Sequence, residues 1–562
     1  MGALLNLSTG VRSHAAMALI VVFAGTLYFS FLGDMRQFLR AESYFTLGSK
    51  MMLETGDRLL MHSPEELPLN KPPLEYWLIG ISLNSLGMDY GPARVPSGIF
   101  ALLTLIVVYV FASRTYGGFV AVSAAAITAT SVFFLAFARL AMPDMVLTFC
   151  VCAAVFSLVG AIRSDTNAQF LTVLAWAAIA LGFLAKGPVA PVLVLGPFFL
   201  EALWSKDLSI LRRLRVITGT AVFVAIASPY FFLVYFRDGI EPLKNWFINE
   251  NLLRFSGAAY SSPRPFWQYP LDSFALGFFP WTLLIIPVWY YDLKYRDRST
   301  DGRTLRILNM TIVFALVFFS ASRFRLDYYI LPVIPIAAIV AARVVSDREI
   351  STIFSNRLLA VFAGLIALPL MVIAAALLSG RLVGALPDVP GLWIGGVSVI
   401  IGLVPSAIFL RKEWRKFMPL AVAGSTFVGA FVTFYIANRQ IAKLQPVAEL
   451  AAQIPEDAEV YTLPSADGWA QDLMFQLPSK KHVIFLPRDG TGPAELRKVL
   501  MSTKPAAALV YKKDVEDIDL PTDDLTVIEG GTVYRGRSIS LKTLQDPNFD
   551  QLEIITNQIP PH

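Results

Sequence analysis

A series of long apolar runs, separated by short charged connections, constrains this sequence more than any other feature. A helix that spans a bilayer needs about 20 apolar residues. Thirteen runs approach or reach that length: 15–33, 94–112, 118–137, 145–162, 169–185, 188–204, 216–236, 271–291, 307–321, 330–345, 358–379, 392–410 and 418–437. Only 16% of the residues are charged, against roughly 25% in soluble domains. The sequence therefore predicts a polytopic α-helical membrane protein with about 13 transmembrane helices.

Basic residues indicate how these spans are oriented. Lysine and arginine gather in four connections, at 206–215, 294–306, 343–357 and 411–416. All four fall on one side if the spans alternate, and basic connections remain in the cytoplasm. We therefore expect a cytoplasmic N-terminus, with a first outer loop at 34–93, a second large outer loop at 237–270 and all residues after 437 on the outside.

The chain changes character after the last apolar run. Its short apolar segments from here on are 460–463, 482–485 and 507–511, and helical patterns alternate with them. Such alternation predicts a small α/β domain. We expect a transmembrane domain over 1–437 and a soluble, extracytoplasmic α/β domain over 438–562, in which Asp514–Asp524 and the residues from Thr543 onward form loop and tail.

Several classes of site find no support in the sequence. The four histidines are scattered, and Cys150 and Cys152 lie two positions apart in one apolar run, so no metal-ligand spacing is present. No glycine-rich nucleotide fingerprint occurs. The sequence predicts no metal site, no required cofactor and no nucleic-acid partner.

Charged residues recur at the outer ends of the predicted spans. The clearest are Glu42, Lys71, Asp144, Lys186, Arg254 and Arg325. Ionisable groups at membrane depth are energetically expensive and by default indicate a functional site. The alternative for each is an interfacial anchor, and that is our interpretation of Arg94, Arg114 and Trp281.

The order of motifs around these residues resembles a known family. The motifs are Glu42, Leu53–Asp57, Asn70–Trp77, Pro143–Met145, Lys186–Pro188, Glu250–Phe255, Arg264–Trp267 and Tyr328–Pro332. Together they resemble the bacterial GT-C glycosyltransferases that use polyprenyl-phosphate sugars and are related to the aminoarabinose transferases of lipid A and the protein O-mannosyltransferases. The resemblance extends from about residue 15 to residue 440.

The resemblance implies an integral-membrane glycosyltransferase of the GT-C type. It would move a hexosyl or pentosyl group from a polyprenyl-phosphate donor, such as undecaprenyl phosphate, with inversion. The acceptor would be a glycolipid such as lipid A, a glycan or a protein, at the outer face of the bacterial inner membrane. No cofactor is required, a divalent metal is left open, and neither the sugar nor the oligomeric state is specified.

This chemistry suggests roles for the outer polar residues. Cations are needed at the leaving phosphate, and the candidates are Lys71, Arg254, Arg325 and Lys186. A carboxylate is needed at the acceptor, and the candidates are Glu42 and Asp144. Further pocket residues are expected to be Arg40, Tyr44, Asn251, Tyr328 and Tyr329.

One position departs from the family pattern. The family usually has consecutive aspartate and glutamate in the first outer loop, whereas this chain has Ala41 and Glu42. Either Glu42 has taken over the missing role, or Asp144 contributes more, or the acceptor is activated differently.

Two other classes of function also fit many spans with intramembrane charges. A flippase or other transporter of lipid-linked sugars is the first, and a non-catalytic scaffold, suggested by the missing aspartate, is the second. The long first outer loop, the soluble C-terminal segment and the lack of an internal repeat favour the transferase over the transporter.

Overall fold

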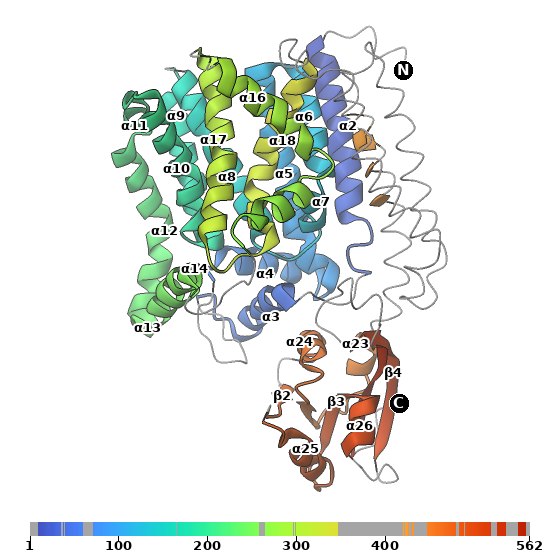
Figure 1. Ribbon diagram of the computed structural model, residues 1–562. Coiled ribbons are helices and arrows are strands. Elements are labelled where there is room, and N and C mark those ends of the chain that lie inside the picture. Colours follow the sequence, from blue (N-terminus) through green and yellow to red (C-terminus); the bar gives the residue numbers. More distant parts are fainter. Residues whose placement is uncertain are drawn as a thin grey trace.

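The computed structural model shows a helical membrane part joined to a small mixed sheet (Figure 1). It describes residues 9–34, 38, 40–59, 71–164, 166–257, 265–295, 297, 299–346, 420, 422–424, 426–427, 430–431, 447–478, 481, 483–487, 489–518, 525–534 and 549–557.

The helices of the membrane part are apolar on most faces; some bury these faces against one another, and others leave much of their apolar surface exposed. They are α2 (Thr9–Phe29), α5 (Tyr90–Tyr116), α6 (Gly118–Thr130), α7 (Val132–Phe137), α8 (Asp144–Arg163), α9 (Ala168–Lys186), α10 (Val189–Ser205), α11 (Ser209–Arg213), α12 (Val216–Asp238), α16 (Ile285–Tyr295), α17 (Thr300–Ala321) and α18 (Ile334–Ser346). Helix α8 lies at the centre, where it packs against α5, α9 and α10.

Within the described residues, seven helices are long and apolar enough to cross a membrane, or eight if one bent pair is a single span. The predicted membrane class is confirmed, but the count of thirteen is not. The predicted span 271–291 is bent by 104° between Gly277 and Thr282. Pro280 lies in that break, and proline lacks the N–H that a continuous helix needs. The expected runs 358–379 and 392–410 lie outside the described residues.

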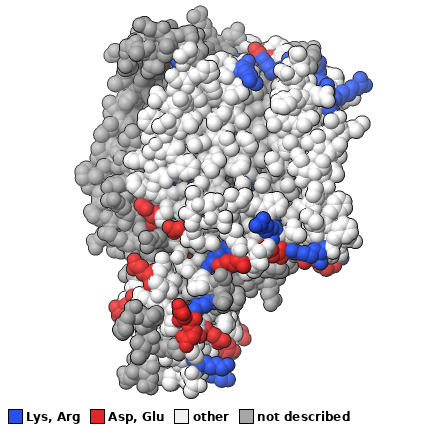
Figure 2. Space-filling model, turned by 180° about the vertical axis from the view of Figure 1, so that it is seen from behind, with Lys and Arg blue, Asp and Glu red and all other residues white. Residues whose placement is uncertain are grey.

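Charges are absent from a broad band of the described surface seen in Figure 2, and they gather toward both ends. Helix α11, which belongs to the first basic connection, lies at the opposite end of the bundle from the two helices of the first outer loop (Figure 1). This arrangement agrees with the predicted separation between the basic connections and that loop.

Short helices cover the end of the bundle that carries the first outer loop. They are α3 (Arg40–Thr55), α4 (Leu74–Leu86), α13 (Glu241–Lys244), the π-helical segments η1 (Asn245–Leu253) and η2 (Pro270–Phe274), α14 (Arg254–Ser256), α15 (Ala275–Gly277) and the 3-10 segments η3 (Thr282–Leu284) and η4 (Asp327–Val333). Helix α3 packs on α4, which in turn packs on α5.

The C-terminal segment forms the predicted α/β unit. Its strands are β1 (Glu459–Thr462), β2 (Val483–Phe485), β3 (Ala506–Tyr511), β4 (Thr526–Tyr534) and β5 (Phe549–Thr556), in the order β2-β1-β3-β5-β4. Its helices are α23 (Val447–Ala451), α24 (Asp467–Gln476), α25 (Gly492–Leu500) and α26 (Lys512–Ile518). The β1–β2 and β1–β3 pairs are parallel, whereas β5 is antiparallel to both neighbours.

Our interpretation of Asp514–Asp524 and of the segment from Thr543 as loop and tail was wrong for residues that the structure describes. The first of these segments begins within α26, and Phe549–Thr556 form β5. Strand β5 lies inside the sheet between β3 and β4, where Leu552, Ile554 and Ile555 are almost completely buried. An antiparallel strand next to β3 completes the hydrogen bonding of that strand, which would otherwise be an exposed edge.

Buried polar contacts attach this domain to helix α3, through Lys50, and to the residues just before it, through Phe38. The ammonium of Lys50 donates to the carbonyls of Met474 (3.0 Å), Phe475 (2.9 Å) and Leu477, at the C-terminal end of α24. The Asp472 carboxylate accepts from the backbone N–H of Phe38 at 2.9 Å. A cation at a helix C-terminus satisfies carbonyls that have no partner within the helix.

Candidate active site

A cavity of about 310 Å³ lies at the end of the bundle that carries α3 and α4. Its polar lining comes from segments far apart in the sequence: Lys71, Lys186, Glu250, Asn251, Arg254 and Tyr329. Trp246, Phe247 and Phe318 supply part of its apolar wall. Five of the eleven residues predicted for the site therefore line one cavity.

Glu250 connects two of the predicted phosphate-binding cations. Its Oε2 atom accepts from the ammonium of Lys71 at 2.7 Å and lies 3.1 Å from Nη1 of Arg254. Burial lowers the pKa of Lys71 to about 8, although Glu250 opposes that shift. The Glu250 carboxylate thus lies between the two cations, Lys71 and Arg254, at a position where a ligand anion could bind instead.

The second ion pair in the site joins Asp144 to Lys186, whose ammonium lies 2.5 Å from Oδ1 of Asp144. The same ammonium lies 4.7 Å from the centre of the Tyr329 ring and 5.4 Å from that of Tyr328. The other oxygen of Asp144, Oδ2, is buried and has no hydrogen-bond partner among the residues described. Asp144 itself does not line the cavity, so Lys186 is the member of this pair that a ligand in the cavity would contact directly.

Local sequence explains how this pair is positioned. Lys186 ends helix α9, and Gly187 follows with a φ of +82° that residues with a Cβ atom rarely adopt. A Cβ atom there would lie 3.0 Å from Trp246. Asp144 is the first residue of α8, where the helix dipole favours a carboxylate.

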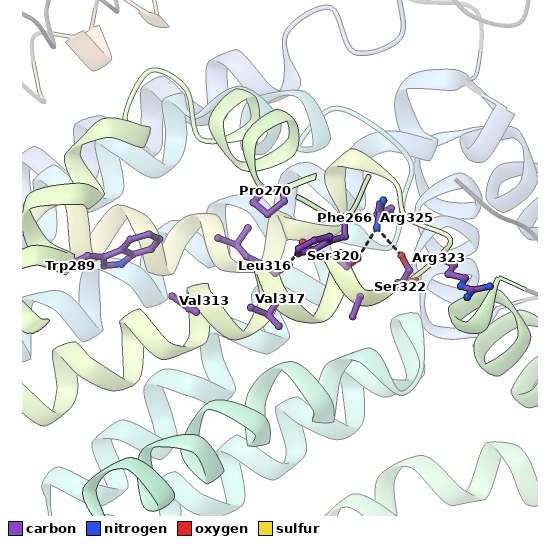
Figure 3. A pocket seen from close by; sticks show the side chains of 11 residues that line it. Phe266, Pro270, Trp289, Val313, Leu316, Val317, Ser320, Ser322, Arg323 and Arg325 are labelled. Carbon is purple, nitrogen blue, oxygen red and sulfur yellow. Dashed lines mark hydrogen bonds between the residues drawn. The ribbon is translucent and has the colours of Figure 1, made fainter. Parts of the chain in front are cut away.

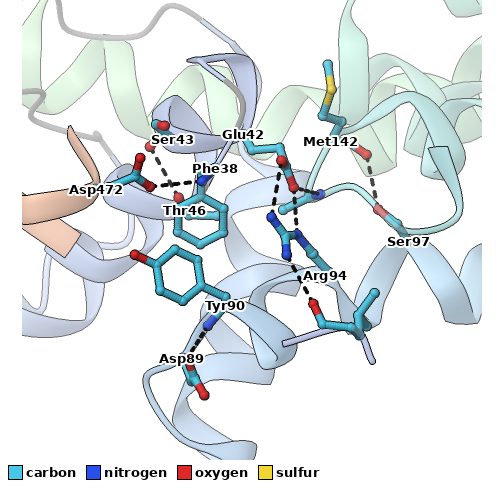
Figure 4. A network of polar contacts seen from close by, with 12 residues as sticks. Phe38, Glu42, Ser43, Thr46, Asp89, Tyr90, Arg94, Ser97, Met142 and Asp472 are labelled. Atoms are coloured by element: carbon cyan, nitrogen blue, oxygen red, sulfur yellow. Dashed lines mark hydrogen bonds and ion pairs between the residues drawn. The ribbon is translucent and has the colours of Figure 1, made fainter. Parts of the chain in front are cut away.

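Glu42 does not line the cavity. It is fully buried, with Oε1 at 3.0 Å from Nε of Arg94 and 2.9 Å from the backbone N–H of Ala141, which donates to it (Figure 4). Our interpretation of Arg94 as an interfacial anchor was wrong, because only 2% of its side chain is exposed. The glutamate joins α3 to α5 and to the segment that precedes Asp144.

Trp281 was also wrongly interpreted as an interfacial anchor. The side chain is fully buried, and its indole Nε1 donates to Oγ1 of Thr130 at 3.3 Å. The bend after Gly277 turns this residue into the bundle, which the apolar pattern of the sequence alone does not reveal.

The remaining predicted site residues lie elsewhere. Tyr44 packs against Tyr76 in a separate apolar cluster, with ring centres 6.3 Å apart. Arg325 donates to the carbonyls of Ser320 (2.6 Å) and Ser322 (3.2 Å) and lines a second cavity. The side chain of Arg40 lies outside what the structure describes.

Sequence reasoning missed two acidic residues at this end of the bundle. Glu250 was noted only as part of a motif. Glu75 was treated likewise, although both of its buried carboxylate oxygens lack a partner in the described part of the chain. Burial and, secondarily, the charge of Asp144 raise the pKa of Glu75 to about 8. A glutamate inside the otherwise apolar run Leu74–Leu78 was the signal that could have identified it.

No group of three or more histidine, cysteine, aspartate or glutamate side chains within the described ranges could hold a metal ion. The cluster instead contains three cations, Lys71, Lys186 and Arg254, and two carboxylates, Glu250 and Asp144. Its chemistry suits an anionic ligand such as a phosphate.

Several known proteins are similar to this chain. Residues 70–232 match the family described as dolichyl-phosphate-mannose-protein mannosyltransferase. An undecaprenyl phosphate-alpha-4-amino-4-deoxy-L-arabinose arabinosyl transferase of Pectobacterium carotovorum is 26% identical over 85% of this chain and 86% of its own length. An uncharacterized protein of Aquifex aeolicus is 28% identical over 53% of this chain.

The coverage of the relatives varies. The aligned region covers 66% of the length of that Aquifex protein, and 65% and 64% of two further relatives. Among solved structures, ArnT from Cupriavidus metallidurans bound to undecaprenyl phosphate has a TM-score of 0.75 at 20% identity and covers 96% of this chain and 98% of its own. At that identity, the likeness concerns the fold.

Proposed function

Because this chain belongs to the superfamily of GT-C membrane glycosyltransferases that includes the aminoarabinose transferases and the protein O-mannosyltransferases, we propose that it transfers a sugar from a polyprenyl phosphate to an acceptor. The observation that carries the proposal is the cavity in which Lys71, Lys186 and Arg254 converge. The four basic connections favour an outer, periplasmic position for this site and a cytoplasmic N-terminus.

The cations serve the leaving phosphate, whose negative charge is kept or grows in the transition state. Lys71 and Arg254 share Glu250 as an anionic partner, and a donor phosphate would compete for the same two groups. The guanidinium can grip two oxygens at once, whereas the ammonium acts as a point charge. Since the pKa of Lys71 is about 8, this residue remains mostly charged near neutral pH.

Asp144 is best placed to activate the acceptor, since its Oδ2 atom has no partner in the described structure while Lys186 holds Oδ1. An acceptor oxygen bonds to the anomeric carbon as the bond from that carbon to the phosphate oxygen breaks. The acceptor proton passes to Asp144, and polyprenyl phosphate leaves with the bonding electron pair. Glu42 acts as a positioning residue, because it holds the N–H of Ala141, three residues before Asp144.

The test is transfer by the purified full chain in lipid nanodiscs, with a radiolabelled sugar on undecaprenyl phosphate. Lys71→Ala and Arg254→Ala should each weaken donor use by about 10- to 100-fold, since a charge-assisted hydrogen bond contributes roughly 1.5–3 kcal/mol. Lys244→Ala is the matched control, because Lys244 is about half exposed and, within the described residues, forms an ion pair with Glu241 alone.

Release of undecaprenyl phosphate together with a labelled acceptor supports the proposal. Movement of the intact donor across sealed vesicles, without cleavage of the sugar–phosphate bond, would instead identify a flippase. Wild-type donor kinetics in both cavity variants would show that Lys71 and Arg254 do not bind the phosphate.

A further inference from the structure

Arg254, one of the cations that we propose for the donor phosphate, lies at the end of a helical stretch. This stretch consists of α13, η1 and α14, and it ends at Gly257. The last carbonyls of a helix have no partner within it, so such an end needs support from elsewhere. The segment Ser322–Arg325, which follows α17, supplies part of that support. Its backbone N–H at Arg323 donates to the carbonyl of Phe255 at 3.0 Å.

Close packing between these two segments depends on Gly257. Its φ is +80°, a conformation that residues with a Cβ atom rarely adopt. A Cβ atom at this position would lie 2.5 Å from the Cβ atom of Arg323, which is too close for two carbon atoms that are not bonded. Glycine therefore lets the chain turn after α14 while the segment Ser322–Arg325 lies directly against it.

Phe324 contacts the guanidinium of Arg254 directly. The Cζ atom of Arg254 lies 4.9 Å from the centre of the Phe324 ring, within the range of a cation–π interaction. An aromatic face attracts a cation through its quadrupole, so the N–H groups of the guanidinium can still bind Glu250 or a phosphate. Both side chains line the donor cavity. Phe324 is thus placed to fix the direction in which Arg254 presents its charge.

A second aromatic contact holds the backbone next to Arg254. The rings of Phe255 and Phe318 are stacked, with centres 5.3 Å apart and planes inclined by 29°. Phe318 belongs to α17, and both rings line the donor cavity. Helix α17 and the segment that follows it therefore both contact the end of the helical stretch that carries Arg254.

Arg325 fixes the end of α17 from which Phe324 extends. Its guanidinium donates to the carbonyls of Ser320 (2.6 Å) and Ser322 (3.2 Å), as the dashed lines in Figure 3 show. The Ser322 hydroxyl in turn donates to the carbonyl of Phe324 at 2.6 Å. Only 8% of Arg325 is exposed, and it lines the second cavity, of about 780 Å³, and not the donor cavity. A cation that satisfies the last carbonyls of a helix stabilises the helix end.

We infer that the segment Ser322–Arg325 positions Arg254 for the donor phosphate. Phe324 is the positioning residue that contacts the guanidinium, and Arg325 acts one step further away by holding the segment at the end of α17. The inference rests on the proposed glycosyl transfer and deepens it, because it gives Phe324 a part in donor binding and moves Arg325 from phosphate binding to positioning.

The first test removes the aromatic face of Phe324 in the full chain in lipid nanodiscs. Phe324→Leu should weaken equilibrium binding of undecaprenyl phosphate by about 3- to 30-fold, the range expected for loss of a cation–π interaction. Phe324→Tyr keeps the ring and should retain most of the affinity. The matched control is Tyr116→Leu, which removes a ring centred 4.7 Å from the guanidinium of Arg343. That pair lines neither cavity, so the affinity should not change.

A double-mutant cycle separates positioning from direct contact with the donor. If Phe324 acts through Arg254, Phe324→Leu should change the affinity by less than about twofold when Arg254 is already alanine. Arg325→Gln should weaken binding in the otherwise wild-type protein, and by less than about twofold in the Phe324→Leu variant. If Arg325→Gln does not fold, the cycle of Phe324 and Arg254 decides alone.

Two results would overturn the inference and leave the proposed transferase intact. An equal loss from Phe324→Leu with and without the Arg254 guanidinium would mean that Phe324 contacts the donor directly. Wild-type affinity in Phe324→Leu would mean that the ring does not position the arginine. Failure of the proposed function itself is a distinct result, in which the wild-type protein releases no undecaprenyl phosphate from a labelled donor with any acceptor.

Discussion

The Glu42 carboxylate and the Arg94 guanidinium lie 3.0 Å apart, and only 0% and 2% of their side chains are exposed. The pair joins the first outer helix to α5 at a depth that water does not reach. Within the family pattern the neighbouring position carries an aspartate, but here it is Ala41. The glutamate that remains is thus engaged in structural contacts, which is why we propose Asp144 for the chemical role.

Glu42→Gln should destabilise the protein by about 3–5 kcal/mol, because Arg94 would remain buried without a compensating charge. Thermal unfolding of the purified protein in detergent measures the loss. The double variant Glu42→Leu/Arg94→Met should recover much of the stability, since a buried ion pair can often be replaced by apolar side chains. A fully stable Glu42→Gln protein that no longer transfers sugar would instead give Glu42 a direct part in the reaction.

Asp144→Asn should lower kcat by roughly 10²–10⁴-fold, the usual cost of removing a general base. Affinity for undecaprenyl phosphate should change little, because Lys71 and Arg254 remain. Single-turnover rates and equilibrium binding of undecaprenyl phosphate separate the two effects. If Asp144→Asn weakened only binding, its main role would be to position Lys186.

Ala41→Asp restores the residue that the family usually carries. We expect transfer at the wild-type rate or faster, since Ala41 lies in the first turn of α3 beside Glu42, which contacts the segment that precedes Asp144. Ala41→Asn, which has the same shape without the charge, should give no gain. Initial rates at saturating donor compare the three proteins, and an inactive Ala41→Asp would indicate that this position no longer faces the reacting atoms.

Glu75 should make stability depend on pH. Its pKa is raised from the ordinary value of 4.5 to about 8, so the folded protein retains a proton that the unfolded chain loses. Stability should therefore fall as the pH rises from about 4.5 to about 8 and change little above that. Glu75→Gln should remove this part of the slope and raise the unfolding temperature most above pH 8. An unchanged pH profile in that variant would show that the carboxylate is ionised in the folded protein.

Much of the donor cavity could be predicted from residue types. Lys186 lies between two apolar runs with only glycine and proline beside it, and Arg254 lies near the end of a polar motif. Placing such a charge in a membrane costs free energy unless it has a partner of opposite charge. Because of that cost, a charged residue at such a position can be recognised as a candidate site residue from the sequence alone. Pairing is a different matter: Lys71 meets Glu250 across 179 positions, and no local pattern specifies which carboxylate will meet which cation.

The misplaced predictions share one physical cause. Arg94 reads as an interfacial anchor because it begins an apolar run, and only the packing of α3 onto α4 and α5 brings Glu42 to it. The direction of Arg325 likewise depends on how α17 ends, since the carbonyls of Ser320 and Ser322 hold its guanidinium at the second cavity. Side chains near helix ends can turn to either face, and tertiary contacts decide which.

The attachment of Lys50 to the last turn of α24 has a consequence for how such proteins can be recombined. An ammonium that caps one particular helix end, together with the Asp472–Phe38 contact, makes α3 and the C-terminal domain a matched pair. In a chimera that takes its C-terminal domain from another family member, the buried ammonium of Lys50 would face a different helix end and could lose its carbonyl partners. Exchange of the C-terminal domain should succeed when α3 and Phe38 are taken from the same protein as the domain, because the contacts between them are then preserved.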